Sequence, residues 1–166
     1  CWGLNDVGQA SPPGGTFVSV TAGGLATCAL SAVGAIICWG NNASGQATPP
    51  SGVFSQIDLG DTSACGVRQA GTVSCWGSNG NGMATPPSGT FTKVSAAVSH
   101  VCGIQTNGQI ACWGYNGDGE GAPPAGTFEA VSAGGYAGSG FTCGVPASIG
   151  RAVCWGGSDS GRTSPP

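Results

Sequence analysis

Cysteine is the residue type that offers the clearest chemistry in this sequence. Eight of the nine cysteines form pairs that are ten or eleven positions apart, and Cys1 has no partner of this kind. Paired thiols either form disulfides in an oxidising compartment or bind zinc where two pairs converge. The Cys-x2-Cys spacing of zinc sites is absent, so we expect no metal and no other cofactor. The predicted disulfides are Cys28–Cys38, Cys65–Cys75, Cys102–Cys112 and Cys143–Cys154.

Each cysteine pair is predicted to close a β-hairpin. Gly34 lies six residues after Cys28, and a glycine holds the same place in the next two pairs. A three-residue loop needs a left-handed residue only at its last position, which glycine adopts without strain. With the loop at residues 32–34, Cys28 lies opposite Cys38 in a non-hydrogen-bonded pair, where Cα atoms are within disulfide range. The fourth hairpin has one residue more.

A repeat of about 37 residues organises the whole chain. Cys-Trp-Gly recurs five times from Cys1, at steps of 37, 37, 37 and 42 residues, and Pro-Pro recurs at the same steps. Such a period is typical of propellers and solenoids. Frequent glycine and proline argue against helices, and short apolar runs such as "FVSV" predict strands with a bend. We treat residues 1–166 as one domain with repeats 1–37, 38–74, 75–111, 112–153 and a partial repeat 154–166.

The composition excludes several classes of protein. Charged residues make up 7% of the chain, against about 25% in an ordinary soluble domain. The four basic residues are scattered, so the basic patch of a nucleic-acid-binding protein is missing. No apolar run reaches the length of a membrane span. Nine cysteines favour an extracellular or cell-surface location, and the start at Cys1 is expected for a mature product or a fragment.

The motifs "CWGxNxxGQ", "PPxGTFxxVxAG" and "CALxxxGxxxCWG" resemble the repeat of the RCC1 (regulator of chromosome condensation 1) family. The resemblance is to its bacterial-type and secreted relatives, which carry cysteine before Trp-Gly. It implies an all-β fold of propeller blades, each with four strands and here with a disulfide-stapled hairpin. Such propellers usually have seven blades, whereas this chain has four full repeats and a partial one. We therefore expect a part of a longer chain, or blades that are completed between chains.

The N-terminal residues are expected to form an open edge. Residues 1–13 have no hairpin before them to complete, so they are predicted to leave an unpaired strand. Open edges pair with other chains, and an odd cysteine in a secreted protein suggests an intermolecular bond. The predicted partners are other copies of the chain or another protein, bound through residues 1–13. The alternative for Cys1 is that residues before it were removed.

Few residues suggest catalysis, and we expect no enzyme. His100, the one histidine, stands where other repeats have Ala26 and Ser63, so a structural hydrogen bond is the favoured role. Asp118 and Glu120 lie in a glycine-rich loop that resembles a weak calcium loop but lacks the EF-hand spacing. No nucleophile–base pair is evident, and no catalytic residue is predicted.

Other recurring residues have structural or surface roles. The five tryptophans are predicted to pack within or between blades, although exposed tryptophans would favour a sugar-binding lectin. They are Trp2, Trp39, Trp76, Trp113 and Trp155. Asn42 begins an N-glycosylation sequon. Hydroxyls before Pro-Pro are candidates for O-linked glycans, or the prolines simply stiffen the connection. These hydroxyls belong to Ser11, Thr48, Thr85 and Ser164.

The fourth repeat has an insertion of about four residues before its first cysteine. Insertions in repeat proteins map to loops, often on a binding face, so Tyr136 and Phe141 are candidates for a partner contact. The alternative is a loop elongation without a function. The function we expect is that of a non-enzymatic extracellular structural protein, a building block of a surface or secreted assembly such as a glycosylated filament. The alternatives are a soluble protein-binding propeller module of the inhibitor type and a lectin.

Overall fold

The computed structural model describes residues 1–136, 138–158, 161 and 163. In this part of the chain, twelve strands form four antiparallel sheets of three strands each. We call these sheets blades 1 to 4. Blade 1 consists of β1 (Ser19–Gly23), β2 (Ala26–Leu30) and β3 (Ile36–Gly40). Blade 2 consists of β4 (Phe54–Leu59), β5 (Ser63–Arg68) and β6 (Val73–Gly77). Blade 3 consists of β7 (Phe91–Ala96), β8 (His100–Gln105) and β9 (Ile110–Gly114), and blade 4 of β10 (Phe128–Tyr136), β11 (Ser139–Pro146) and β12 (Val153–Gly156).

The predicted all-β, blade-type fold is confirmed, but each blade has three strands instead of four. The segments that follow the first four Cys-Trp-Gly motifs close into turns, with a short 3-10 helix, η1 (Gly80–Gly82), in one of them. An asparagine side chain holds the turns in each of these four segments: Asn42 Oδ1, for example, accepts a hydrogen bond of 2.9 Å from the N–H of Ala47. This compact loop leaves no extended backbone for a fourth strand.

The hairpin between the second and third strands has the predicted register. Cys28 pairs with Cys38 and Leu30 with Ile36. Gly34 closes the loop with a left-handed φ of 80°, and its N–H donates to the carbonyl of Ser31 at 2.9 Å. Glycine at this place therefore aligns the two cysteines. The predicted bend in the first strand appears in blades 2, 3 and 4 as a register shift just after the phenylalanine.

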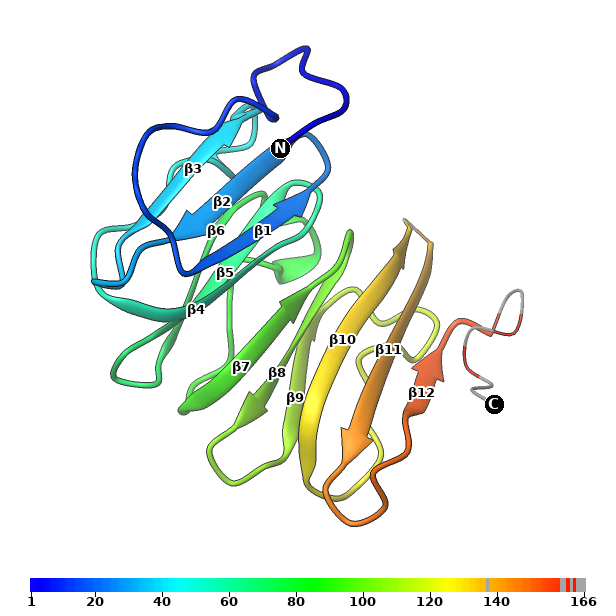
Figure 1. Ribbon diagram of the computed structural model, residues 1–166. Coiled ribbons are helices and arrows are strands. Elements are labelled where there is room, and N and C mark those ends of the chain that lie inside the picture. The colour runs from blue at the N-terminus through cyan, green and yellow to red at the C-terminus, as the bar shows by residue number, and fades with distance from the viewer. Residues whose placement is uncertain (137, 159–160, 162, 164–166) are drawn as a thin grey trace.

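The blades stand side by side in sequence order, with blade 1 and blade 4 at opposite ends of the row (Figure 1). The first strand of each blade packs on the second strand of the blade before it. Between blades 1 and 2, for instance, Cys28 and Leu30 of β2 share a buried cluster with Phe54 and Ile57 of β4. The core therefore lies between blades, in successive clusters along the row.

The insertion in the fourth repeat does not form the expected loop. It lengthens the first hairpin of blade 4, in which β10 and β11 pair from Phe128 to Tyr136 and from Ser139 to Pro146. Gly134 lies opposite Phe141 in this hairpin, so the added residues continue the ladder. Among the described residues, no helix has the length and apolar character needed to cross a bilayer.

Candidate functional site

The four blades carry the same four cysteine pairs that the hairpin register predicts. The bonds are Cys28–Cys38, Cys65–Cys75, Cys102–Cys112 and Cys143–Cys154. Each joins the second strand to the third, with Cα atoms 4.0–4.1 Å apart. In blades 1 to 3 the first cysteine is completely buried under the next blade, whereas Cys143 is half-buried. The four disulfides indicate an oxidising environment.

A tryptophan in each third strand fastens the preceding loop to its blade. The indole N–H of Trp76 donates to the backbone carbonyl of Gln46 at 2.9 Å, and its ring meets Phe54 at a centroid distance of 6.2 Å. The other three blades repeat both contacts. The indole bonds are Trp39 to Gln9, Trp113 to Met83 and Trp155 to Glu120, at 2.8–2.9 Å. The side chains that a lectin would expose are therefore used for packing.

Trp2 is the exception, and the prediction that it packs a blade is wrong. Its side chain is 96% exposed. A packed tryptophan needs a phenylalanine on the first strand of its own blade and a carbonyl in the loop before that blade. For Trp2, both groups would have to come from residues outside this sequence.

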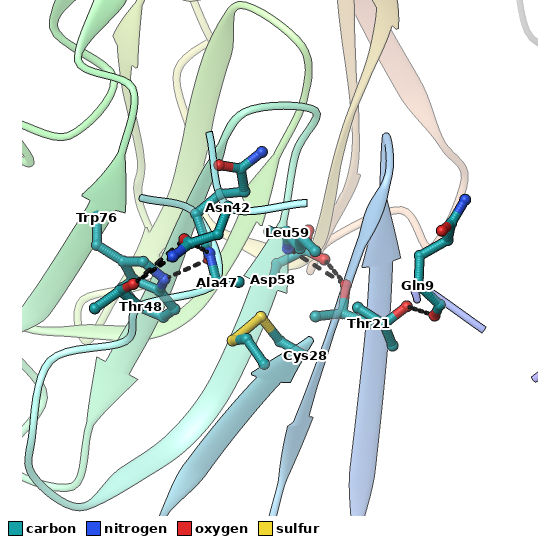
Figure 2. The surroundings of a disulfide bond; sticks show 12 residues. Gln9, Thr21, Cys28, Asn42, Ala47, Thr48, Asp58, Leu59 and Trp76 are labelled. Atoms are coloured by element: carbon teal, nitrogen blue, oxygen red, sulfur yellow. Dashed lines mark hydrogen bonds between the residues drawn. A yellow bond between two sulfur atoms is a disulfide. The ribbon is translucent and has the colours of Figure 1, made fainter. Parts of the chain in front are cut away.

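The candidate glycosylation residues that the structure describes form hydrogen bonds that close the loops after Cys-Trp-Gly. The Asn42 side chain donates to Thr48 Oγ1 at 2.9 Å while it accepts the bond from Ala47 (Figure 2). Asn5 bonds Ser11 in the same way, and the Thr85 hydroxyl donates to Asn79 at 3.2 Å. Asparagine and a hydroxyl six residues later thus close the first three loops, whereas in the fourth loop Asn116 accepts the N–H of Gly121 and the sixth residue is Ala122. Asn42 and Thr48 are nevertheless exposed, and Ser164 lies outside the described residues.

A ladder of side-chain oxygens joins each first strand to the next. Thr21 Oγ1 accepts the N–H of Leu59 at 3.3 Å and donates to Asp58 Oδ1 at 2.7 Å (Figure 2). Asp58 Oδ2 accepts the N–H of Ala96 at 2.9 Å, and Ser95 Oγ accepts the N–H of Ala133 at 3.1 Å. We call Thr21, Asp58, Ser95 and the equivalent Ser132 the acceptor ladder. A side chain with an oxygen atom recurs here every 37 residues, and this signal in the sequence could have predicted the contact between blades.

The two ends of the row expose the two halves of one repeated interface. On blade 1 the head face, made of Phe17, Val20 and Ala22, has no blade before it in this chain. Val20 is 62% exposed, whereas its equivalents Ile57 and Val94 are 4% exposed. An exposed apolar face of this kind marks an interaction site.

On blade 4 the tail face, made of Ser132, Cys143 and Val145, is followed by no further blade among the described residues. All three residues are half-buried or exposed. In blade 1, by contrast, the equivalents of Cys143 and Val145 are Cys28 and Leu30, which are at most 4% exposed. Ser132 is the last member of the acceptor ladder. The tail face thus offers what blades 1 to 3 offer to the blade that follows each of them.

Residues 1–13 do not form the predicted unpaired strand. They form turns that pack on blade 1, where the carbonyl of Gln9 accepts bonds from Trp39 and from the Thr27 hydroxyl at 3.0 Å. The side-chain oxygen of Asn5 accepts the N–H of Ala10 and closes this loop, as Asn42 closes the next one. Cys1 is an exposed free thiol beside the head face. The open surface at this end is therefore the face of β1 and not a strand edge at residues 1–13.

His100 has the structural role that was favoured. It is fully buried between blades 3 and 4, and its Nε2 lies 2.8 Å from Thr142 Oγ1. Thr142 donates its own proton to the carbonyl of Glu120 at 2.9 Å, so Nε2 of His100 must be the donor. Nδ1 is then bare and has no partner among the described residues. Burial lowers the pKa of His100, and the buried Glu120 carboxylate opposes this effect in part.

This buried histidine predicts a loss of stability in acid. Because the pKa is lower in the folded than in the unfolded chain, the unfolded chain takes up the proton first as the pH falls. The free energy of unfolding should be constant above about pH 6.5 and decrease below it. Urea unfolding from pH 7.5 to 5 measures this slope. His100→Gln, which can donate to Thr142 but does not titrate, should flatten it, and an equal slope in both proteins contradicts the assignment.

The two candidate partner residues lie on the lengthened hairpin of blade 4. Tyr136 ends β10 and is 58% exposed, and Phe141 is half-buried on β11. A Cβ atom on Gly134 would lie 3.0 Å from the Phe141 ring, so this ring covers the glycine opposite it. The hairpin brings both aromatic residues to one end of blade 4, and their contact with a partner stays a prediction.

The fold and its repeated interfaces define a row of propeller blades, and comparison with known proteins identifies the repeat. Residues 17–46 and 54–82 match the family model described as the regulator of chromosome condensation (RCC1) repeat. These two segments therefore match the RCC1 repeat that the sequence motifs resemble. No curated protein shows significant sequence similarity to it.

Solved structures of receptor ectodomains are similar to this chain. The entire ectodomain of the receptor kinase CR4 from Physcomitrella patens has 28% identity over 93% of this chain and 45% of its own, with a TM-score of 0.75. The CRINKLY WD40 ectodomain of the receptor kinase ACR4 from Arabidopsis thaliana has 31% identity over 85% of this chain and 51% of its own, with a TM-score of 0.68. Yeast RCC1 (Prp20), bound to Kap60, shares the fold at 15% identity over 87% of this chain and 45% of its own, with a TM-score of 0.72. This chain spans about half the length of these proteins.

Proposed function

We propose that this chain is a non-enzymatic extracellular structural unit whose end faces join further RCC1-type blades in a larger assembly. The observation that carries the proposal is the exposure of Val20, at 62%, where Ile57 and Val94 are at 4%. The same apolar position is buried in blades 2 and 3 and half-buried, as Val131, in blade 4.

The contacts between neighbouring blades support the proposal, because they repeat three times in one pattern. At each contact a cysteine of the second strand packs under a phenylalanine of the next first strand, and a ladder oxygen accepts an N–H from that strand. Each end of the row offers one half of this pattern. A further blade of the same repeat fits these faces in both shape and hydrogen bonding.

The extracellular location has two kinds of support. Four disulfides require an oxidising compartment to persist. The two neighbours with the higher sequence identities are ectodomains of receptor kinases. The similarity to receptor ectodomains also supports a second candidate function. This function is recognition of a protein partner by the assembled blades, with Tyr136 and Phe141 as contact residues.

Replacement of Val20 by aspartate tests the proposal. If a blade covers the head face in the native secreted protein, the carboxylate must be buried against it, and that blade should detach. Burial of one valine contributes about 1.5–3 kcal/mol, so amide hydrogen exchange in β1 should become about ten- to a hundredfold faster. Hydrogen–deuterium exchange with peptide-level mass spectrometry measures this change.

Val18→Asp is the matched control. Val18 precedes β1 and is 66% exposed, but its equivalents Ser55, Thr92 and Glu129 are exposed polar residues in blades that do have neighbours. This variant should leave the exchange of β1 unchanged. Equal exchange rates in the wild type and both variants would mean that nothing covers the head face, and the proposal would then fail.

A further inference from the structure

We infer that the blade that covers the head face is blade 4 of a second copy of this chain, so that copies associate head to tail. This inference rests on the proposed function and names the partner of the same faces. One molecule carries both halves of the blade interface, at opposite ends of the row (Figure 1), and this arrangement points to a second copy.

The apolar parts of the two faces are complementary by the pattern inside the chain. Phe54 and Ile57 of blade 2 pack on Cys28 and Leu30 of blade 1. The equivalents at the ends of the row are Phe17 and Val20 on the head face, and Cys143 and Val145 on the tail face. Docking of a second copy would therefore cover the half-buried Cys143–Cys154 disulfide as Phe54 covers Cys28–Cys38.

The acceptor ladder fixes the register of this contact. Thr21, Asp58 and Ser95 each accept the N–H of the residue 38 positions later in the chain. Ser132 is the next member, and the residue equivalent to Leu59, Ala96 and Ala133 at the head of another copy is Ala22. Ser132 Oγ of one copy should thus accept the N–H of Ala22 of the next. In the same register, Ser132 lies beside Thr21 of that copy, as Asp58 lies beside Thr21 within the chain.

The rotation between two docked copies decides the form of the assembly. A head-to-tail contact is heterologous, and it gives a closed ring if the rotation closes and a filament if it does not. The mass of the assembly separates these forms, because a ring stops at a fixed number of copies and a filament does not.

Cross-linking between two variants tests the inference in the folded, oxidised chain. Thr21→Cys and Ser132→Cys are each made together with Cys1→Ser, which removes the exposed thiol. After the two proteins are mixed, a short bis-maleimide should join them into a dimer on a non-reducing gel. Neither variant alone should give this product, because the head-to-tail contact brings unlike faces together. Val18→Cys in place of Thr21→Cys is the control, and it should reduce the yield at least tenfold.

Three outcomes would overturn the inference, and they separate it from the proposed function. Cross-linking of Thr21→Cys with itself would mean a head-to-head contact. Absence of the mixed product, while Val20→Asp still accelerates exchange in β1, would mean that another RCC1-type blade or partner covers the head face. In that case the proposed function stands and the second copy does not. Absence of both effects would reject both.

Discussion

Reduction of the four disulfides is expected to unfold the chain. In the chain-entropy model, a loop of this length contributes about 3 kcal/mol to the free energy of unfolding. Four such loops together contribute on the order of 10 kcal/mol, which is comparable with the whole stability of a typical domain, about 5–15 kcal/mol. Circular dichroism and tryptophan fluorescence during a dithiothreitol titration measure the loss of structure. A chain that keeps its sheet signal after all eight cysteines have been alkylated would contradict this expectation.

The disulfides should also be reduced in a fixed order. Cys28, Cys65 and Cys102 are completely buried under the following blade, whereas Cys143 is half-buried on the tail face. The second cysteine is half-buried in every pair, and only in blade 4 are both cysteines half-buried. The thiolate of a reductant needs access to a sulfur atom, so the bond in blade 4 should open first. Alkylation at early times, followed by peptide mass spectrometry, reports the order. Docking of another blade on the tail face would slow this first step.

Replacement of Trp76 by alanine should cost about 3–5 kcal/mol of unfolding free energy, the usual range for a buried aromatic residue. The side chain is 8% exposed, packs edge-on against Phe54, and holds the loop before its blade through the carbonyl of Gln46. Trp2→Ala is the matched control, since that side chain is 96% exposed and should change the stability by less than about 0.5 kcal/mol. Chemical denaturation of the oxidised proteins compares them, and similar losses for both would contradict the assigned roles.

A second replacement at the same position separates packing from hydrogen bonding. Trp76→Phe keeps an aromatic ring against Phe54 but removes the indole donor, which leaves the carbonyl of Gln46 without its partner. An unsatisfied buried group costs about 1–3 kcal/mol. Phenylalanine should therefore recover part of the loss caused by alanine. Full recovery would mean that the hydrogen bond to the loop contributes nothing.

The hairpins could be predicted from the sequence because their signal is local. Gly34 at a fixed place after Cys28 sets the loop length, and loop length sets which residues lie opposite each other. The all-β repeat could be predicted for the same reason, since turns and strands recur at a constant step. The packing of four tryptophans could be predicted from their fixed position in the repeat. The packing prediction was wrong for Trp2. The repeat motif alone does not show that the phenylalanine and the loop carbonyl that a packed tryptophan contacts are missing for Trp2 in this sequence.

The contacts between blades could not be predicted because different residue types serve one purpose. Thr21, Asp58 and Ser95 have different side chains, and a search for identical residues passes over them. What they share is a side-chain oxygen that can accept an N–H from the next first strand. The open end was misplaced for a related reason. Residues 1–13 resemble a strand edge only if the segment is extended. Asn5 instead closes it into a loop, and the Gln9 carbonyl attaches this loop to blade 1.

The way in which the loops are fastened has a consequence for engineering. Each loop is closed by its own asparagine and is held by a bond from tryptophan to a backbone carbonyl, which every amino acid possesses. The residues at that carbonyl are accordingly diverse: Gln9, Gln46, Met83 and Glu120. A loop can therefore be exchanged as a cassette between repeats, or replaced by one of new sequence, without loss of its anchor. The scaffold thus separates what keeps a loop in place from what the loop displays.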